Sequence, residues 1–474
     1  MELFGDENWD DDLEPESPKK DGSYDDELNG LKERLRNGGG GANIEVLEEI
    51  VNFYVEHEKF VEALHFVDLL VEYLPYNADA WQRKGVILNN LRRYAEALDC
   101  FDRALNLNPQ DPELTIHRGV TLDSLGRHDE ALACFDSILE IEPANEDALF
   151  SKIVTYQKTD RWEEAVSLLQ KILTVDPMHK DAWYELAYCY DMTERHADAL
   201  KCYDTHLEID PYNFTAWYNR GILYNRMGQY AKAIESYNMA LAIKEELGDA
   251  WYNKGNAYAN MGRLYDSIEC YREAIRIHPR DISSWHNMGN AYEELGLYKD
   301  GIKCFTQAIK YDARHYESFF GRGSCYDSLE QFRKAYNDYN KALSICKNYP
   351  DLWYAKADVA YNLGKWREAL IGYKMVVRFD PTNTEAWYDL GDTLLEYGYF
   401  KESLKAFNKC IELQPKWAEP FYSRAKVLFL LHKTFDALES LKRAFELDPT
   451  KKKLFESEFP GVKSIKEITS LLSK

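Results

Sequence analysis

The sequence predicts an all-α fold, an α-solenoid of twelve tandem units that are each 34 residues long. Three residue types carry this prediction, because tryptophan, proline and alanine each recur at intervals of 34 residues. The series include Trp183, Trp217, Trp251 and Trp285; Pro75, Pro109, Pro143, Pro177 and Pro211; and Ala97, Ala131, Ala165, Ala199 and Ala233. The units begin at residues 44, 78, 112, 146, 180, 214, 248, 282, 316, 350, 384 and 418 and end at 451, without insertion or deletion.

Each unit is expected to form two helices. In the unit from 248, Trp251, Gly255 and Tyr258 share one helical face, and Met261–Arg263 interrupts the pattern. A second apolar face follows and ends at Pro279, because proline cannot donate the helical hydrogen bond. With the first residue of a unit counted as place 1, glycine at place 8 is expected to face the small residue at place 20, which would let the paired helices approach closely.

The same positions carry a family signature. The unit from 214 shows W-x3-G-x2-Y followed by A-x3-Y-x2-A, at Trp217, Gly221, Tyr224, Ala233, Tyr237 and Ala240. This pattern resembles the tetratricopeptide repeat (TPR) family over 408 of the 474 residues. The resemblance implies a right-handed superhelix of more than one turn, closed by a C-terminal capping helix.

The stretch from 282 to 349 departs most from the repeat. Gly301 stands where alanine is expected, and Ala313 and Lys347 replace the terminal proline. Glycine inside a helix costs about 1 kcal/mol relative to alanine, so a hinge or irregularity is expected there.

The two ends differ from the repeats. Residues 1–43 hold 13 acidic and 5 basic residues, and Gly38–Gly41 is expected to be a flexible linker, so a disordered tail that does not dock on the array is predicted. This tail is either solubilising or a docking motif for a partner. Residues 452–474 are expected to cap the last unit through a short helix at Lys453–Glu458 and a second helix with an apolar stripe, or else to offer a helix to a partner.

Charge and composition argue against several classes of function. The net charge of −23 opposes binding to nucleic acid or to anionic lipid. No apolar run is long enough to span a membrane and no secretory signal is visible, so a soluble, cytoplasmic protein is predicted.

The motifs of catalysis and metal binding are missing from the sequence. Cys100, Cys134, Cys202, Cys270 and Cys304 share one place in their units and are expected to be buried free thiols, since equivalent atoms in adjacent layers are too far apart for a disulfide. The histidines are scattered and no phosphate loop or nucleophile elbow occurs, so no enzyme, no metal and no cofactor is predicted.

The resemblance implies that the first helix of each unit lines a concave groove. Place 5 is then an aromatic row, which continues beyond 290 as Phe320, Tyr354, Tyr388 and Tyr422, and asparagine fills place 6 in three successive units. TPR grooves that hold extended peptides through asparagine ladders are similar. The expected peptide-binding residues are Tyr184, Tyr218, Asn219, Asn225, Asp249, Tyr252, Asn253, Asn256, Asn260, His286, Asn287 and Asn290.

These residues leave alternatives open. Tyrosine at place 5 and asparagine at places 6 and 9 are common in TPRs, where they also serve helix stability and solubility. The lysines that bind acidic C-terminal tails in co-chaperone TPRs are missing, and place 2 is Asp or Glu in ten of the twelve units. The sequence therefore predicts a non-enzymatic scaffold for a protein or peptide partner that is extended and basic or apolar. The alternative is a structural subunit that packs through repeat edges or its convex face, and the oligomeric state is open.

Overall fold

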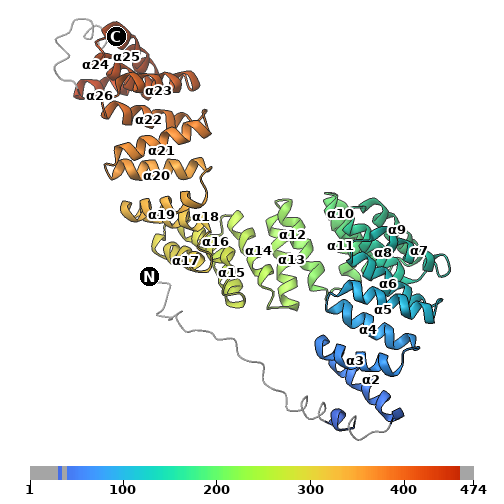
Figure 1. The fold of residues 1–474 in the computed structure, drawn as a ribbon. Coiled ribbons are helices and arrows are strands. Elements are labelled where there is room, and N and C mark those ends of the chain that lie inside the picture. The colour runs from blue at the N-terminus through green and yellow to red at the C-terminus, as the bar shows by residue number, and fades with distance from the viewer. Residues whose placement is uncertain (1–29, 35–39, 459–474) are drawn as a thin grey trace. The chain divides into compact units, whose positions relative to one another are not determined.

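The computed structural model describes residues 30–34 and 40–458. The chain divides into two units, one ending at Pro211 and the other beginning at Tyr212 (Figure 1). The first unit holds α2 (Gly40–Glu56), α3 (Phe60–Tyr73), α4 (Ala78–Asn90), α5 (Tyr94–Leu107), α6 (Pro112–Ser124), α7 (His128–Leu139), α8 (Glu146–Lys158), α9 (Trp162–Val175), α10 (Lys180–Met192) and α11 (His196–Ile209).

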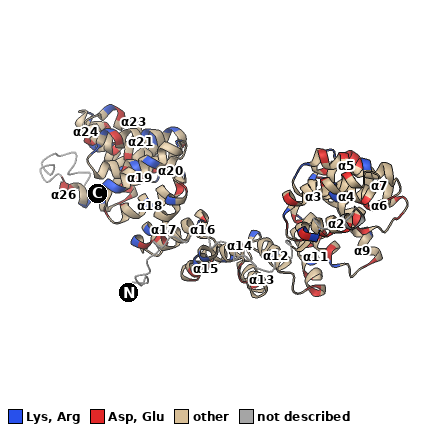
Figure 2. Ribbon diagram, turned by 60° about the horizontal axis from the view of Figure 1, so that its bottom comes forward, with Lys and Arg blue, Asp and Glu red and all other residues tan. Residues whose placement is uncertain are grey.

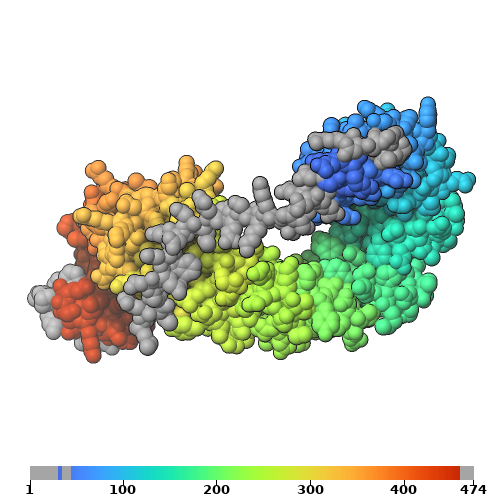
Figure 3. Space-filling model, turned by 90° about the horizontal axis from the view of Figure 1, so that it is seen from below, coloured from blue at the N-terminus to red at the C-terminus, as the bar shows by residue number. Residues whose placement is uncertain are grey.

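The second unit continues the same alternation of helices. It holds α12 (Phe214–Arg226), α13 (Tyr230–Ile243), α14 (Gly248–Asn260), α15 (Leu264–Ile277), α16 (Ile282–Glu294), α17 (Tyr298–Tyr311), α18 (Tyr316–Ser328), α19 (Phe332–Ile345), α20 (Pro350–Asn362), α21 (Trp366–Phe379), α22 (Thr384–Glu396), α23 (Phe400–Leu413), α24 (Ala418–Leu430), α25 (Thr434–Leu447) and α26 (Thr450–Glu458). Within each unit, every repeat lies beside its neighbours in sequence, as the gradual colour change in Figure 3 shows. The predicted all-α solenoid is confirmed.

The helix boundaries follow the 34-residue period. From α4 to α24, the first helix of each pair begins on the residue at which its predicted unit begins. Side chains just before most of these helices accept backbone N–H groups, as Asn213 does from Ala216 at 3.0 Å and Asn383 from Ala386 at 2.8 Å. The turn inside a pair needs a left-handed residue, which is Gly262 (φ +72°) in the unit from 248.

A hydrogen bond links the tryptophan of a repeat to the place six residues earlier where the proline series stands. The indole N–H of Trp285 donates to the carbonyl of Pro279, six residues earlier, at 3.0 Å. Trp251 makes the same bond to Glu245 at 3.0 Å, and Trp353 to Lys347 at 2.8 Å. Because the bond uses only a backbone carbonyl, units without the terminal proline keep it.

The place-8 glycine faces the small residue at place 20, as predicted, and also an aromatic ring. The Ser403 hydroxyl, at place 20, donates to the carbonyl of Gly391, at place 8, at 2.7 Å. A Cβ on Gly255 would lie 2.7 Å from the ring of Tyr271, and one on Gly221 would lie 2.5 Å from the ring of Tyr237. The glycine therefore also makes room for the aromatic ring at place 24 of its own unit, which the sequence did not predict. The aromatic side chain is buried as deeply as the alanine series.

The expected hinge at 282–349 is not where the chain divides, since the boundary between the units follows Pro211. A Cβ on Gly301 would lie 3.1 Å from the Sγ of Cys325 and 3.3 Å from the carbonyl of Gly289. Glycine at this place thus lets α17 pack closely against its neighbours, which explains the departure from alanine without a loosened structure.

The N-terminal segment also differs from the prediction. Residues 30–34 are helical, and Leu31 packs against the apolar cluster of α2 and α3. Arg34 forms an ion pair with Glu49 at 2.6 Å, and the Lys32 ammonium lies over the ring of Tyr54. This part of the tail therefore does dock on the array, and α2 begins at Gly40 inside the expected linker. The remaining residues before 40 lie outside the described ranges.

At the other end, α26 follows the last pair. Its Phe455 is buried against Tyr422 and Phe445, so this helix covers apolar surface of α24 and α25. The expected apolar stripe at 462–472 lies outside the described residues. The division of the chain at residues 43 and 451 stays a prediction.

The cysteines are free thiols, as expected. Burial raises the pKa of Cys100 and Cys270 to about 11 and that of Cys202 to about 12. None of the described helices is both long and apolar enough to cross a bilayer.

Candidate functional site

The sequence-predicted site residues fall on first helices. Tyr218, Asn219 and Asn225 lie on α12, residues 249–260 on α14, and His286, Asn287 and Asn290 on α16, all in the second unit. Tyr184 lies on α10 of the first unit, where its ring contacts Tyr203 and His206. The candidate site thus centres on α12, α14 and α16, where successive helices contact each other.

Tyrosine hydroxyls and asparagine amides form a ladder between successive repeats. The Asn253 amide nitrogen donates to the Tyr218 hydroxyl at 2.9 Å, and the Asn287 amide donates to the Tyr252 hydroxyl at 3.1 Å. Place 5 of one repeat is thereby tied to place 6 of the next. Sequence analysis brought these residues to one face but missed the pairing between them.

One step of this ladder is a closed network, which we call the neutral rung: Tyr252, Asn256, Tyr271 and Asn287. The Asn287 amide also donates to the Asn256 side-chain oxygen at 3.0 Å, and the Tyr271 hydroxyl donates to the same oxygen at 2.8 Å. The Asn256 oxygen thus accepts two hydrogen bonds, and both amide hydrogens of Asn287 are engaged. These hydrogen bonds link three helices, α14, α15 and α16.

His286 continues the aromatic row as a neutral ring. Burial, together with the neighbouring His315, lowers the pKa of His286 to about 4. Its Nδ1 lies 3.2 Å from the Ser318 hydroxyl, and the Asn290 amide lies 3.1 Å from its Nε2. A neutral imidazole here offers hydrogen bonds but no charge near neutral pH.

The other predicted residues hold more local positions. The Asn260 amide donates to the backbone carbonyl of Asn256 at 2.9 Å, which keeps it on its own helix. The side-chain oxygen of Asn225 is buried and accepts no hydrogen bond. Asp249 lies in the first turn of α14, and its charge adds to burial in raising the pKa of Tyr218.

A second polar network lies three repeats further on, and sequence analysis missed it. The positions of the neutral rung plus 102 residues are Tyr354, Asp358, Tyr373 and Asp389, which we call the acidic rung. The Tyr373 hydroxyl donates to Asp358 at 2.6 Å, and the Tyr354 hydroxyl donates to Asp389. The signal in the sequence was the change from asparagine to aspartate at places 9 and 6 of consecutive units.

The acidic rung borders a cavity of about 320 Å³ between α20, α21 and α22. It is lined by Asp358, Tyr361, Asn362, Tyr373, Asp389, Asp392 and Thr393. Burial raises the pKa of Asp358 to about 6, and burial also raises the pKa of Asp389 and Asp392. Acidic side chains here are thus held where their charged forms are poorly solvated.

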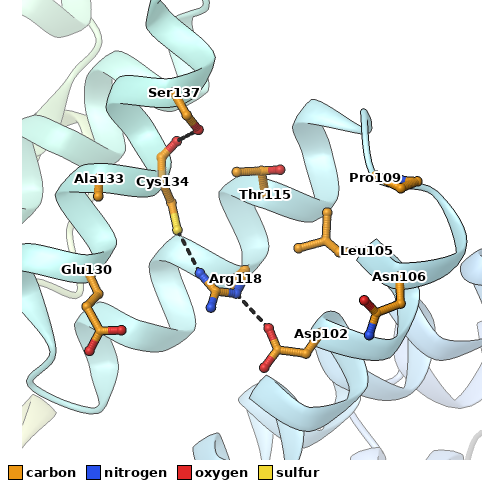
Figure 4. A pocket seen from close by; sticks show the side chains of 10 residues that line it. All are labelled: Asp102, Leu105, Asn106, Pro109, Thr115, Arg118, Glu130, Ala133, Cys134 and Ser137. Carbon is orange, nitrogen blue, oxygen red and sulfur yellow. Dashed lines mark hydrogen bonds and ion pairs between the residues drawn. The ribbon is translucent and has the colours of Figure 1, made fainter.

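A larger, shallow cavity of about 700 Å³ lies in the first unit between α5, α6 and α7. Arg118 stands at its centre and donates to Asp102 at 2.6 Å and to the Cys134 sulfur at 3.2 Å (Figure 4). Lys84 pairs in the same way with Asp68 of the preceding repeat at 2.8 Å. We interpret Arg118 as a tie between repeats, because its charge is already matched.

Charged residues of both signs are spread over the helices (Figure 2). In the part of the chain that the structure describes, no three His, Cys, Asp or Glu side chains are grouped so as to hold a metal ion. The polar groups of the ladder and of the acidic rung are suited to hydrogen bonding and charge pairing with a ligand.

Comparisons with known proteins concern the fold. Family models described as tetratricopeptide repeat match residues 78–111, 122–173, 179–246, 212–280, 282–315, 316–349 and 384–417. No curated protein matches the sequence.

Three solved structures give the range of similarity. YrrB, a TPR protein with an unusual peptide-binding site, is 24% identical over 38% of this chain and 94% of its own, with a TM-score of 0.37. MamA is 17% identical over 35% and 97%, with a TM-score of 0.34. The APC/C hetero-tetramer Cut9-Hcn1 matches over 95% and 93% at 15% identity, with a TM-score of 0.39. At these TM-scores the structural likenesses say nothing about function. The family models, however, cover most of the chain. The chain therefore belongs to the tetratricopeptide repeat family.

Proposed function

We propose that this protein is a non-enzymatic scaffold that holds an extended segment of a partner protein along the first helices of the second unit. The observation that carries the proposal is the tyrosine–asparagine ladder on α12, α14 and α16. It places hydrogen-bonding groups at repeat intervals along one face. The family match supports a protein-interaction role.

The ladder leaves side-chain carbonyl oxygens with which a peptide backbone can form hydrogen bonds. An amide that donates to a tyrosine still has a carbonyl oxygen, which can accept a backbone N–H from a ligand. Each such bond contributes only about 0.5–1.5 kcal/mol, whereas ordering a peptide costs several times more. Affinity must therefore come from side chains seated against Tyr218, Tyr252 and His286.

The charge near the ladder selects the kind of partner. Asp249 begins α14 and Glu293 lies near the end of α16, where burial raises its pKa. A basic or apolar segment is therefore favoured over an acidic one. The same charge disfavours nucleic acid, and we propose a cytoplasmic location for the complex.

The test is capture of a partner by the full chain. Partners recovered by affinity purification and identified by mass spectrometry are expressed, and their affinity is measured with wild type and with Asn219, Asn253 and Asn287 all changed to Ala. Binding should weaken at least about tenfold. Retained affinity would place the binding surface elsewhere.

The structure supplies a matched control for this test. Because Asn253 and Asn287 also tie repeats together, the triple variant could act through the fold. Tyr218→Phe with Tyr252→Phe removes the same two ladder hydrogen bonds and keeps the amides. If the phenylalanine variant loses binding as strongly as the alanine variant, the asparagines act through structure and the proposal fails.

A second candidate is a structural subunit that packs through a repeat edge. Large exposed apolar side chains lie at or just beyond the ends of second helices in the first unit, with Val175 86%, Ile141 82% and Tyr76 87% exposed. Exposed apolar side chains that gather on a surface are typical of an interaction site. Sedimentation of wild type and of Ile141→Lys with Val175→Lys would test it, because only an edge contact would make the lysine variant smaller in solution.

A further inference from the structure

The cavity beside the acidic rung carries negative charge that the described side chains do not neutralise. Asp358, Asp389 and Asp392 line it, and none of the ion pairs formed by the described residues includes them. Lys426 is the basic group that acts on Asp392, and its ammonium is paired with Glu458 at 2.7 Å. A partly buried group of carboxylates without a cation is costly, so a compensating ligand is expected.

The neutral rung shows what the acidic rung lacks. In the neutral rung, the Asn287 amide donates an N–H to the side-chain oxygen of Asn256 at 3.0 Å. At the equivalent positions stand Asp389 and Asp358, and ionised carboxylates only accept hydrogen bonds. The two side chains of the acidic rung therefore cannot satisfy each other as those of the neutral rung do, and they need donors from elsewhere. This comparison within one molecule is independent of the charge count.

The tyrosines of the acidic rung donate one hydrogen bond to each carboxylate and leave its other lone pairs open. The Tyr373 hydroxyl donates to Asp358 at 2.6 Å, and the Tyr354 hydroxyl donates to Asp389. Each hydroxyl has one proton, and these bonds use it. The remaining lone pairs of both carboxylates can accept donors from a ligand in the cavity.

We propose that the cavity binds a cationic side chain, arginine or lysine, of a partner segment, whose N–H groups donate to the carboxylates of Asp358 and Asp389 and so supply the donors that the acidic rung lacks. This inference rests on the proposed function, in which a partner lies along the first helices. A guanidinium offers five donors in a plane and can bridge two carboxylates. The ring of Tyr361, which also lines the cavity, provides an aromatic surface for the cation.

Two other occupants fit less well. Metal ions prefer several oxygen ligands at short distance, and the described residues contain no group of three side chains at that spacing. A proton can bridge the carboxylates in acid, since burial raises the pKa of Asp358 to about 6 and the charges of Asp389 and Asp327 add to this. Around pH 7.5 the carboxylates are mainly charged, and a cationic side chain is the matching ligand.

The test uses the full chain and fluorescein-labelled hexa-arginine, with hexa-lysine, hexa-glutamine and hexa-glutamate as comparison peptides. Affinity is measured by fluorescence anisotropy at pH 7.5 and 150 mM salt, roughly physiological ionic strength. The variant is Asp358→Asn with Asp389→Asn, which restores the side chains of the neutral rung. The matched control is Glu402→Gln with Glu439→Gln, which removes the same charge from exposed positions on α23 and α25.

Hexa-arginine should bind wild type and the control with affinities within about twofold, and bind the aspartate variant at least about tenfold more weakly. The peptide, hexa-arginine or hexa-lysine, whose affinity falls more in the aspartate variant carries the cation that the cavity prefers. No binding of either cationic peptide to wild type, or an equal loss in the aspartate variant and the control, would overturn the inference. Circular dichroism of both variants checks that the helices are intact.

The outcomes separate this inference from the proposed function. If the asparagine triple variant loses its partner while the aspartate variant still binds hexa-arginine normally, the scaffold stands and the cavity inference is wrong. If the triple variant keeps its partner and the aspartate variant alone loses hexa-arginine, the cavity is a cation site and the ladder is not the binding surface.

Discussion

Replacing Asp358 and Asp389 together by Asn should stabilise the second unit, and the gain should grow as the pH rises. Burial, followed by the charges of Asp389 and Asp327, raises the pKa of Asp358 from 3.8 to about 6. A carboxyl whose pKa is raised in the folded state favours folding when protonated and opposes it when ionised. The cost is therefore small below the unfolded pKa and complete above about pH 7.

The magnitude follows from the distance between these two pKa values. Each pKa unit corresponds to about 1.4 kcal/mol, so ionising Asp358 in the folded protein costs about 3 kcal/mol at pH 7.5 and about 1 kcal/mol at pH 4.5. Tyr373, which donates to Asp358, acts in the opposite direction. For a domain of 150–250 residues, about 1 kcal/mol shifts the Tm by roughly 2–4 °C.

The assay is differential scanning calorimetry of the full chain at pH 4.5, 6.0 and 7.5, with wild type and variant compared at each pH. The comparison removes the general effect of acid on other carboxylates, which both proteins share. The Tm difference should be small at pH 4.5 and several degrees in favour of the variant at pH 7.5. A difference that does not change with pH, or a less stable variant at pH 7.5, would refute the reasoning.

Three further predictions concern packing. Gly255→Ala should lower the free energy of unfolding by about 1–2 kcal/mol, because the new methyl would lie 2.7 Å from the Tyr271 ring. The better helix propensity of alanine offsets only part of this cost, and an unchanged thermal melt would contradict the prediction. Ala233→Leu should cost about 1–3 kcal/mol, because Ala233 is fully buried, and a melt like wild type would mean that the site can expand. Leu31→Ala should cost about 1 kcal/mol and speed hydrogen exchange in α2, since Leu31 packs on the cluster there; exchange like wild type would show that the contact does not stabilise α2.

The repeat period was sufficient to predict the helices. Their first residues from Ala78 to Ala418 match the predicted unit starts because the 34-residue period runs through the chain without insertion or deletion. The aromatic partner of the place-8 glycine could not be deduced in this way. Both Ala233 and Tyr237 lie on the second helix of their unit, and only the rotation of the paired helices brings the Tyr237 ring against Gly221.

The candidate site shows the same limit. The sequence brought Tyr252 and Asn287 to one surface, but their hydrogen bond spans 35 residues and depends on the offset between adjacent repeats. The acidic rung was missed because Asp358 and Asp389 are far apart in sequence and each is unremarkable among 81 acidic residues. The 102-residue correspondence with the neutral rung becomes meaningful only when the hydrogen bonds of both are known.

The indole hydrogen bonds between repeats make tryptophan fluorescence a reporter of single repeat junctions. Trp285, Trp353 and Trp387 each donate to a carbonyl six residues earlier, in the turn that joins two repeats. Indole emission shifts to longer wavelength when such a contact opens to water. A chain that keeps one of these tryptophans, with phenylalanine at the other positions, would report the opening of one chosen junction. The unfolding of a solenoid whose repeats contact mainly their neighbours can thus be followed by fluorescence at one junction at a time.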